Sequence, residues 1–108
     1  MEIALRLYRA NSKAKLYQEI YENSLHELYL FQPESLTFLT VNRGARENLG
    51  YTSEELSTMT PLDIKPEFDV QSFRKLLEPL FRGEQEQITL NTVHQLKDGS
   101  HYPVEVNL

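Results

Sequence analysis

Apolar and polar residues alternate along residues 88–96 and again along residues 100–108. A period of two is typical of β-strands, and Lys97, Asp98 and Gly99 between the two stretches predict a hairpin. A two-residue turn would divide the apolar side chains between both faces of the sheet, whereas a three-residue loop with a left-handed Gly99 keeps them on one face. The expected cross-strand pairs are His94 with Tyr102, Thr92 with Val104, Leu90 with Val106 and Ile88 with Leu108.

The first part of the sequence has a different period. Apolar side chains recur there at spacings of three and four, which predicts an amphipathic helix over residues 1–22. The stripe consists of Ile3, Leu7, Ala10, Ala14, Tyr17 and Tyr21. Such a stripe serves equally to dock the helix on its own domain or to pair it with a second copy in a dimer. Both interpretations are kept as alternatives.

The middle of the sequence predicts a hairpin followed by helices. Residues 25–32 and 36–41 are rich in strand-forming side chains and flank a turn at Pro33. Polar N-cap residues and left-handed glycines then delimit three short helices and one longer helix over residues 69–81, which contains Pro79. We expect Pro79 to kink this helix or loosen its last turn. The capping residues are Asn42, Gly50, Thr52 with Glu55, Thr60 with Asp63, Asp69 and Gly83.

Strands at both ends with helices between them predict an α+β domain over residues 23–108, in which an antiparallel sheet carries its helices on one face.

The composition of the sequence excludes several classes of function. The sequence has 108 residues, a formal net charge of −5 and no cysteine. Negative charge argues against nucleic-acid binding, and the absence of cysteine excludes disulfides and thiolate metal sites. No apolar run reaches membrane-spanning length, so we expect a cytoplasmic domain without membrane contact. The histidines lack the spacing of metal ligands, and no metal site is expected.

Three motifs in their order along the chain resemble the PAS sensory domain family. They are the run Val41-Asn42 with Ala45, Arg46, Leu49, Gly50 and Tyr51, the run Ser53-Glu54-Glu55-Leu56, and residues 94–106 around Lys97-Asp98-Gly99. The resemblance implies a five-stranded antiparallel sheet, helices cupped over one face with a small pocket between, and a leading helix that often dimerises. Glu54, Glu55 and Lys97 are expected to be surface charges, and the resemblance also suggests an ion pair between Glu55 and Lys97.

The sequence departs from the family at its end, because the last strand of the family, which lies centrally in the sheet, has no counterpart after Leu108. Its lack predicts open strand edges that favour pairing with another chain. We therefore expect a fragment of a larger bacterial-type sensor, and a homodimer formed through the first helix or the open sheet edge.

The cofactor and the ligand site are only partly constrained by the sequence. Without cysteine, neither a flavin–cysteine adduct nor a thioester-linked chromophore can form. The resemblance implies that an axial histidine for haem would come from the long helix, and residues 69–81 contain none, so haem is disfavoured and His94 is left as the alternative ligand. No particular cofactor is therefore expected. His94 and Tyr102, on the predicted inner face, are candidate ligand-binding residues, and Asn42 is a third. For each, the competing interpretation is structural: a packed, hydrogen-bonded histidine and a helix-capping asparagine.

Two functions follow as hypotheses. The first is a non-enzymatic input domain that binds a small ligand, or transmits dimer geometry, to a covalently linked output domain such as a histidine kinase or diguanylate cyclase. The second is a constitutive dimerisation module with a filled core and no ligand. An enzyme is disfavoured, because the alternation puts His94 and Glu105 on opposite faces of the sheet, where they cannot share acid–base chemistry.

Overall fold

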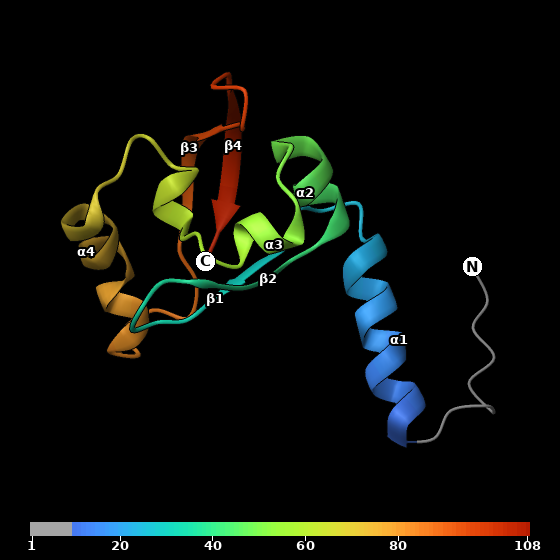
Figure 1. The fold of residues 1–108 in the computed structure, drawn as a ribbon. Helices are drawn as coiled ribbons and strands as arrows, with labels where there is room; N and C mark the ends of the chain where they lie inside the picture. Colours follow the sequence, from blue (N-terminus) through green and yellow to red (C-terminus); the bar gives the residue numbers. More distant parts are fainter. Residues whose placement is uncertain (1–9) are drawn as a thin grey trace.

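The computed structural model describes residues 10–108 (Figure 1). Its helices are α1 (Ala10–Asn23), α2 (Arg43–Leu49), α3 (Ser53–Leu56), the 3-10 helix η2 (Pro61–Asp63) and α4 (Val70–Phe81). Its strands are β1 (Tyr29–Phe31), β2 (Phe38–Val41), β3 (Thr89–Gln95) and β4 (His101–Asn107). The order of elements is the predicted one, and the α+β fold class is confirmed.

The β3–β4 hairpin has the register that the alternation predicts. His94 lies opposite Tyr102 and Thr92 opposite Val104. Gly99 has a φ of 89°, and its N–H donates to the Leu96 carbonyl at 2.9 Å, which closes the three-residue loop. At the other end, Ile88 and Leu108 exchange two backbone hydrogen bonds of 2.8 and 3.0 Å, as a hydrogen-bonded antiparallel pair does. The apolar pattern and one glycine are sufficient to fix this register.

The β1–β2 pair is shorter than predicted, and each strand loses residues for a different reason. The backbone N–H of Leu28 bonds to the Asn42 side chain at 3.0 Å instead of to a strand, so β1 starts only at Tyr29. Leu36 has a φ of 65°, which no strand accommodates, and β2 starts after it at Phe38. A β-bulge between Leu30 and Phe31 further bends the pair.

Among residues 10–108 the strands form two separate two-stranded sheets, β1–β2 and β3–β4, rather than one continuous sheet. Leu108 and Ile88 form a hydrogen-bonded pair, and such pairs recur at every second residue of an antiparallel ladder. The even-numbered residues of β4 therefore direct their backbone N–H and C=O groups toward β3. Pro103, Glu105 and Asn107 therefore direct their backbone groups away from β3. β1 likewise has β2 as its one partner in this part of the chain, so each pair keeps a free edge.

Side-chain caps delimit the helices as predicted. The Asn42 side chain accepts from Ala45 N–H at the start of α2, and Gly50 ends that helix with a φ of 85°. Complete capping boxes begin α3 at Thr52, η2 at Thr60 and α4 at Asp69. α4 continues through Pro79 to Phe81, so the proline lies inside its last turn. Local sequence thus decides where these helices start and stop.

Two clusters of buried apolar side chains hold the helices against the strands. The larger cluster joins β2 to α2, α3 and the residue after η2, and the smaller joins the β1–β2 turn to α4. Their buried members are Phe38, Val41, Ala45, Leu49, Leu56 and Ile64 in the first, and Leu36, Phe73 and Leu77 in the second. Because both clusters lie on the helix-covered side of the strands, polar side chains on that side are shielded from water.

Helix α1 leaves the body formed by the other elements and touches it only near its C-terminal end (Figure 1). There the Tyr21 hydroxyl donates to the Leu28 carbonyl at 2.9 Å, and Arg46 of α2 forms an ion pair with Glu22 at 2.9 Å. Earlier in α1, the side chains of Tyr17 and Ile20 are 66% and 53% exposed. Ile3 and Leu7 of the predicted stripe lie outside the described residues, and Ala10 is the first residue of the helix. Within residues 10–108 no helix is both long and apolar enough to cross a membrane.

Candidate functional site

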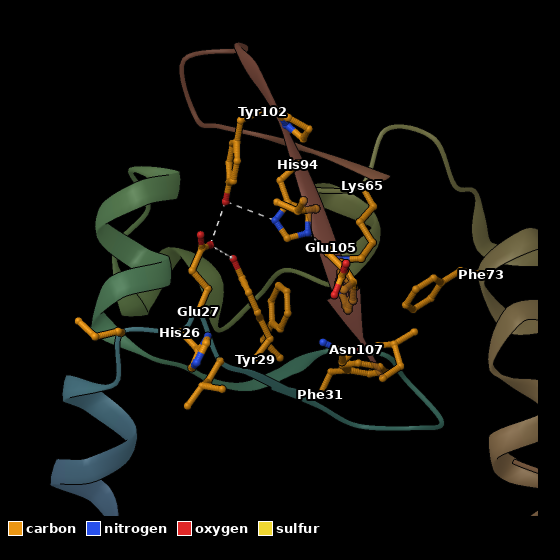
Figure 2. A pocket seen from close by; sticks show the side chains of 18 residues that line it. His26, Glu27, Tyr29, Phe31, Lys65, Phe73, His94, Tyr102, Glu105 and Asn107 are labelled. Carbon is orange, nitrogen blue, oxygen red and sulfur yellow. Dashed lines mark hydrogen bonds between the residues drawn. The ribbon is translucent and has the colours of Figure 1, made fainter. Parts of the chain in front are cut away.

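A cavity of about 650 Å³ lies between the two strand pairs, where β1 and β4 present their free edges (Figure 2). Aromatic and aliphatic side chains form most of its wall, and a group of polar side chains gathers on one side. The apolar members include Phe31, Phe38, Phe73, Val104 and Val106, and the polar members include Glu27, Tyr29, Lys65, His94 and Tyr102.

The polar side chains form one hydrogen-bonded chain. Lys65 Nζ lies 2.8 Å from His94 Nε2, and His94 Nδ1 lies 3.4 Å from the Tyr102 hydroxyl oxygen. The Tyr102 hydroxyl in turn donates to Glu27 Oε1 at 2.9 Å (Figure 2). The four residues come from four separate segments: the loop after η2, β3, β4 and the segment before β1. The fold, and not any local motif, brings them together.

The charge state of His94 determines which atom donates and which accepts in each of these hydrogen bonds. His94 is 3% exposed, and its burial, followed by the neighbouring Lys65 charge, lowers the pKa of His94 to about 3. The imidazole is therefore neutral near pH 7. An ammonium can only donate, so His94 Nε2 is the acceptor from Lys65 and the ring proton sits on Nδ1, facing Tyr102. Every bond then runs in one sense, from the Lys65 ammonium to the Glu27 carboxylate.

Glu27 is the acceptor on which several segments converge. Its Oε1 accepts from the Tyr29 hydroxyl at 2.7 Å as well as from Tyr102, and its Oε2 accepts from Asn48 Nδ2 at 3.0 Å. Burial, followed by the bond to Glu27, raises the pKa of Tyr29, and the same two causes raise the pKa of Tyr102. Both phenols therefore stay protonated and keep donating. Glu27 lies four residues after α1, so the cavity is connected to the exit of that helix.

Lys65 is the cationic member of the site. Burial lowers the pKa of Lys65 to about 8, and the charge of Glu27 offsets part of this effect. The ammonium also lies 5.9 Å from the centre of the Tyr29 ring, within the range of a cation–π contact. A buried amine beside a neutral imidazole and an apolar wall gives the cavity one polar, positively charged end.

Asn42, the third predicted site residue, is not among the cavity-lining residues. Its side chain is 0% exposed and bonds to four backbone groups. Its Oδ1 accepts from the N–H of Leu28 and Ala45, and its Nδ2 donates to the carbonyls of Tyr21 and His26. The residue thus ties the end of α1, the segment before β1 and the start of α2 together. The structure gives it the structural role that was its competing interpretation.

The structure brings the predicted residues His94 and Tyr102 together with Lys65, Glu27 and Tyr29, three residues that the sequence analysis did not single out. Lys65 stands alone between Ile64 and Pro66, where an isolated lysine gives no pattern to read. Its burial at 5% is unusual for lysine, which is almost never fully buried without a partner, and only the packed structure reveals it.

The other titratable candidates lie away from the cavity's polar end. Lys97 Nζ is 2.6 Å from Glu55 Oε2, which confirms the ion pair that the resemblance implied. His26 and His101 are exposed, although His26 contributes to the cavity rim. Among residues 10–108, no group of three or more potential metal-ligating side chains comes together.

Comparison with solved structures identifies the fold. The structure superposes on the PAS domain of an HTR-like protein from Haloarcula marismortui with a TM-score of 0.76 and 20% identity, over 90% of this chain and 82% of that chain. It superposes on a PAS domain from a two-component sensor histidine kinase with a TM-score of 0.72 and 21% identity, over 93% and 84%. For the PAS domain of a Desulfitobacterium hafniense protein the TM-score is 0.67 and the identity 28%, over 81% and 79%.

The chain therefore has the fold of a PAS domain, the class of module to which these three solved structures belong. No protein-family model matches the sequence, and no curated protein matches it. The likeness thus lies in the backbone, and the chemistry of the site has to be argued from the residues of this chain.

Proposed function

We propose that this chain is a cytoplasmic, non-enzymatic input domain that binds a small molecule at the cluster of polar side chains around His94 and Tyr102. The observation that carries the proposal is the composition of the cavity: an apolar wall with one cluster of convergent polar side chains, two of which have strongly shifted pKa values. Such a combination is the usual mark of a ligand site. The PAS fold of the chain, which is shared with a sensor histidine kinase, supports the sensory role.

The route from the cavity to the rest of a sensor would run through Glu27. A ligand that contacts His94 or Tyr102 competes with the Tyr102–Glu27 bond and frees a carboxylate in the segment that follows α1. Asn42 fixes the same segment to Tyr21 at the end of that helix. A change in the cavity would therefore shift the balance between two positions of α1, which is how a ligand biases a covalently linked output domain. A histidine kinase or a diguanylate cyclase is the proposed output.

Native mass spectrometry of the protein, purified without denaturation, tests ligand binding directly. The proposal predicts a species heavier than the polypeptide that disappears on unfolding. The double variant His94→Ala with Tyr102→Phe should lose that added mass, whereas His101→Ala, a change at an exposed histidine on β4, should keep it. A protein that carries no added mass, and gains none from a panel of small acids, amides and alcohols, would count against the proposal.

A second candidate function is a dimerisation module, and the exposed apolar side chains of α1 favour it. Tyr17 is 66% exposed and Ile20 53% exposed on a helix that extends away from the body. Removal of residues 1–18 should then lower the dimer fraction in analytical ultracentrifugation. A monomer–dimer balance that is the same with and without these residues would exclude pairing through this helix.

The free edge of β4 is an alternative dimer interface, and a proline substitution distinguishes it from pairing through α1. The N–H of Glu105 points away from β3, so Glu105→Pro removes an edge donor without breaking the hairpin. The neighbouring Val104→Pro would remove a donor to β3 and serves as the destabilising comparison. A dimer that uses this edge should dissociate in Glu105→Pro at unchanged stability, and a dimer that survives would exclude the edge.

A further inference from the structure

The free edges of β1 and β4 line the same cavity, and both present backbone groups to it. On β1, the Asn42 N–H donates to the Leu28 carbonyl at 3.0 Å, so Leu28 faces β2 and the next residue, Tyr29, directs its N–H and C=O away from β2. On β4, the residues that direct backbone groups away from β3 and line the cavity are Pro103, Glu105 and Asn107. We call the space between Tyr29 and these three residues the edge groove.

The two edges are out of phase with each other. The Tyr29 side chain packs against the buried apolar cluster and so faces inward, whereas the Glu105 side chain is exposed and faces outward. Residues directly opposite each other in an antiparallel ladder have their side chains on the same face, so β1 and β4 cannot pair directly in that way. One strand between them fits both edges, because successive residues of a strand alternate both the face of the side chain and the direction of the backbone groups.

None of the strands in residues 10–108 can supply this inserted strand, even from a second copy. A strand bonded to both edges of the groove needs two free edges of its own. Each of the four described strands already has a partner along one edge. The inserted strand therefore has to be an extended segment from outside the described part of the chain.

The surroundings of the edge groove define the side chains that such a segment needs. Inward positions lie beside Phe31, Val104 and Val106, which favours apolar residues there. An outward position lies opposite Glu105, and the chain has a formal net charge of −5, so basic residues are favoured on the outward face. An antiparallel direction is favoured, because antiparallel pairs are the more stable and the more common.

We propose that the edge groove binds one extended peptide segment of another polypeptide, antiparallel to β1 and β4. The segment is apolar at its inward positions and basic at its outward positions. Backbone hydrogen bonds to both edges supply affinity, and the alternating side chains supply specificity. The resemblance to the PAS family implies a central strand in the sheet, and this inference adds that the groove accepts a strand without a covalent link and states its chemistry. It goes beyond the proposed function and does not depend on it.

Fluorescence anisotropy with labelled seven-residue peptides tests the proposal. The first peptide has valine at its even positions, threonine at both ends and lysine at the two remaining positions. The second is identical except that the backbone nitrogens of its lysines are methylated. Wild-type protein should bind the second at least about tenfold more weakly, because methylation removes two backbone donors and changes no side chain. A third peptide, with glutamate in place of lysine, should also bind more weakly than the first.

Protein variants locate the binding site. Glu105→Pro removes a donor from the edge groove and should weaken binding of the first peptide. Asn91→Pro is the matched control and should keep wild-type affinity, because Asn91 is an exposed residue of β3 whose backbone groups face the opposite edge of the same hairpin. Circular dichroism of both variants checks that they are folded.

Equal affinity of wild-type protein for the methylated and unmethylated peptides overturns the proposal, even where Glu105→Pro fails to fold. Failure of the first peptide to bind overturns it as well. If that peptide does not bind and the protein is a dimer that dissociates in Glu105→Pro, the edge is occupied by a second copy instead. Equal affinity for the lysine and glutamate peptides overturns the assigned charge of the outward face. Native mass spectrometry for a bound small molecule decides the proposed function separately.

Discussion

The Tyr102 hydroxyl donates a 2.9 Å hydrogen bond to Glu27 Oε1, across 75 positions of sequence. Tyr102 belongs to β4, and Glu27 lies two residues before β1, so this bond joins the two strand pairs at a point where, within residues 10–108, no backbone ladder connects them. The same bond forms one side of the cavity. The connection between the two strand pairs and the wall of the cavity therefore depend on the same pair of side chains.

Tyr102→Phe removes this connection without changing the shape of the side chain. Glu27 loses one of its donors and His94 Nδ1 loses its acceptor, and we expect the free energy of unfolding to fall by about 1–2 kcal/mol. Urea denaturation followed by circular dichroism measures the change. Tyr17→Phe, at a tyrosine that is 66% exposed, is the control and should leave the midpoint unchanged. An equal midpoint for Tyr102→Phe and wild-type protein would show that the bond contributes nothing.

Gly99→Val tests the loop that sets the β3–β4 register. A Cβ at Gly99 would meet no atom within 4 Å, so the cost arises from its φ of 89° alone. We expect a destabilisation of about 1 kcal/mol or more, because a β-branched residue strongly disfavours a left-handed backbone. Gly44→Ala in α2 is the matched control: its Cβ would lie 3.7 Å from the Ser24 carbonyl oxygen, an ordinary contact, and alanine favours a helix. Equal stability of the two variants would contradict the assigned loop.

Asn42→Ala tests the structural role of the buried amide. The change removes bonds to Tyr21, His26, Leu28 and Ala45, and we expect a loss of about 2 kcal/mol or more. Hydrogen exchange should increase most over residues 21–28, because these are the groups that Asn42 holds. Asn91→Ala, at an exposed asparagine of β3, should change neither property. Faster exchange spread evenly over the chain would argue against a local tie.

His94→Gln tests the neutral imidazole through the pH dependence of stability. The pKa of His94 is lowered to about 3 in the folded state, from an ordinary value of 6.5. Between these values the unfolded chain binds a proton that the folded chain does not, so wild-type stability falls as the pH is lowered through this range. The variant lacks this contribution, and its stability should fall less steeply, by about 1 kcal/mol per pH unit between pH 6 and pH 4. His101→Gln is the matched control. Parallel pH profiles for His94→Gln and wild type would contradict a neutral His94.

The parts of the fold that were predictable are those that short sequence patterns determine. The β3–β4 register follows from alternation and Gly99, and the helix ends follow from Asn42, Thr52 and Asp69, because a cap bonds to backbone only two or three residues away. The β1–β2 boundaries were misjudged because a distant side chain, Asn42, takes the place of a strand partner and because Leu36 adopts a left-handed backbone.

Only part of the candidate site was predictable, for the same reason. His94 and Tyr102 face each other across one hairpin, and the hairpin register places both. Lys65 lies 29 residues from its partner His94 in the sequence, and Glu27 lies 75 residues from its partner Tyr102. No local sequence pattern encodes contacts between residues so far apart. A hydrogen-bonded chain built by tertiary packing becomes visible only when the whole chain is folded.

A crystal structure of the protein purified without denaturation would show whether a small molecule is bound. We expect electron density for a small molecule in contact with His94 and Tyr102. The contrary result is a cavity closed by its own side chains, with His94 and Tyr102 either packed against each other without space for a guest or turned into bulk solvent. That result would leave the dimerisation module as the function of this chain.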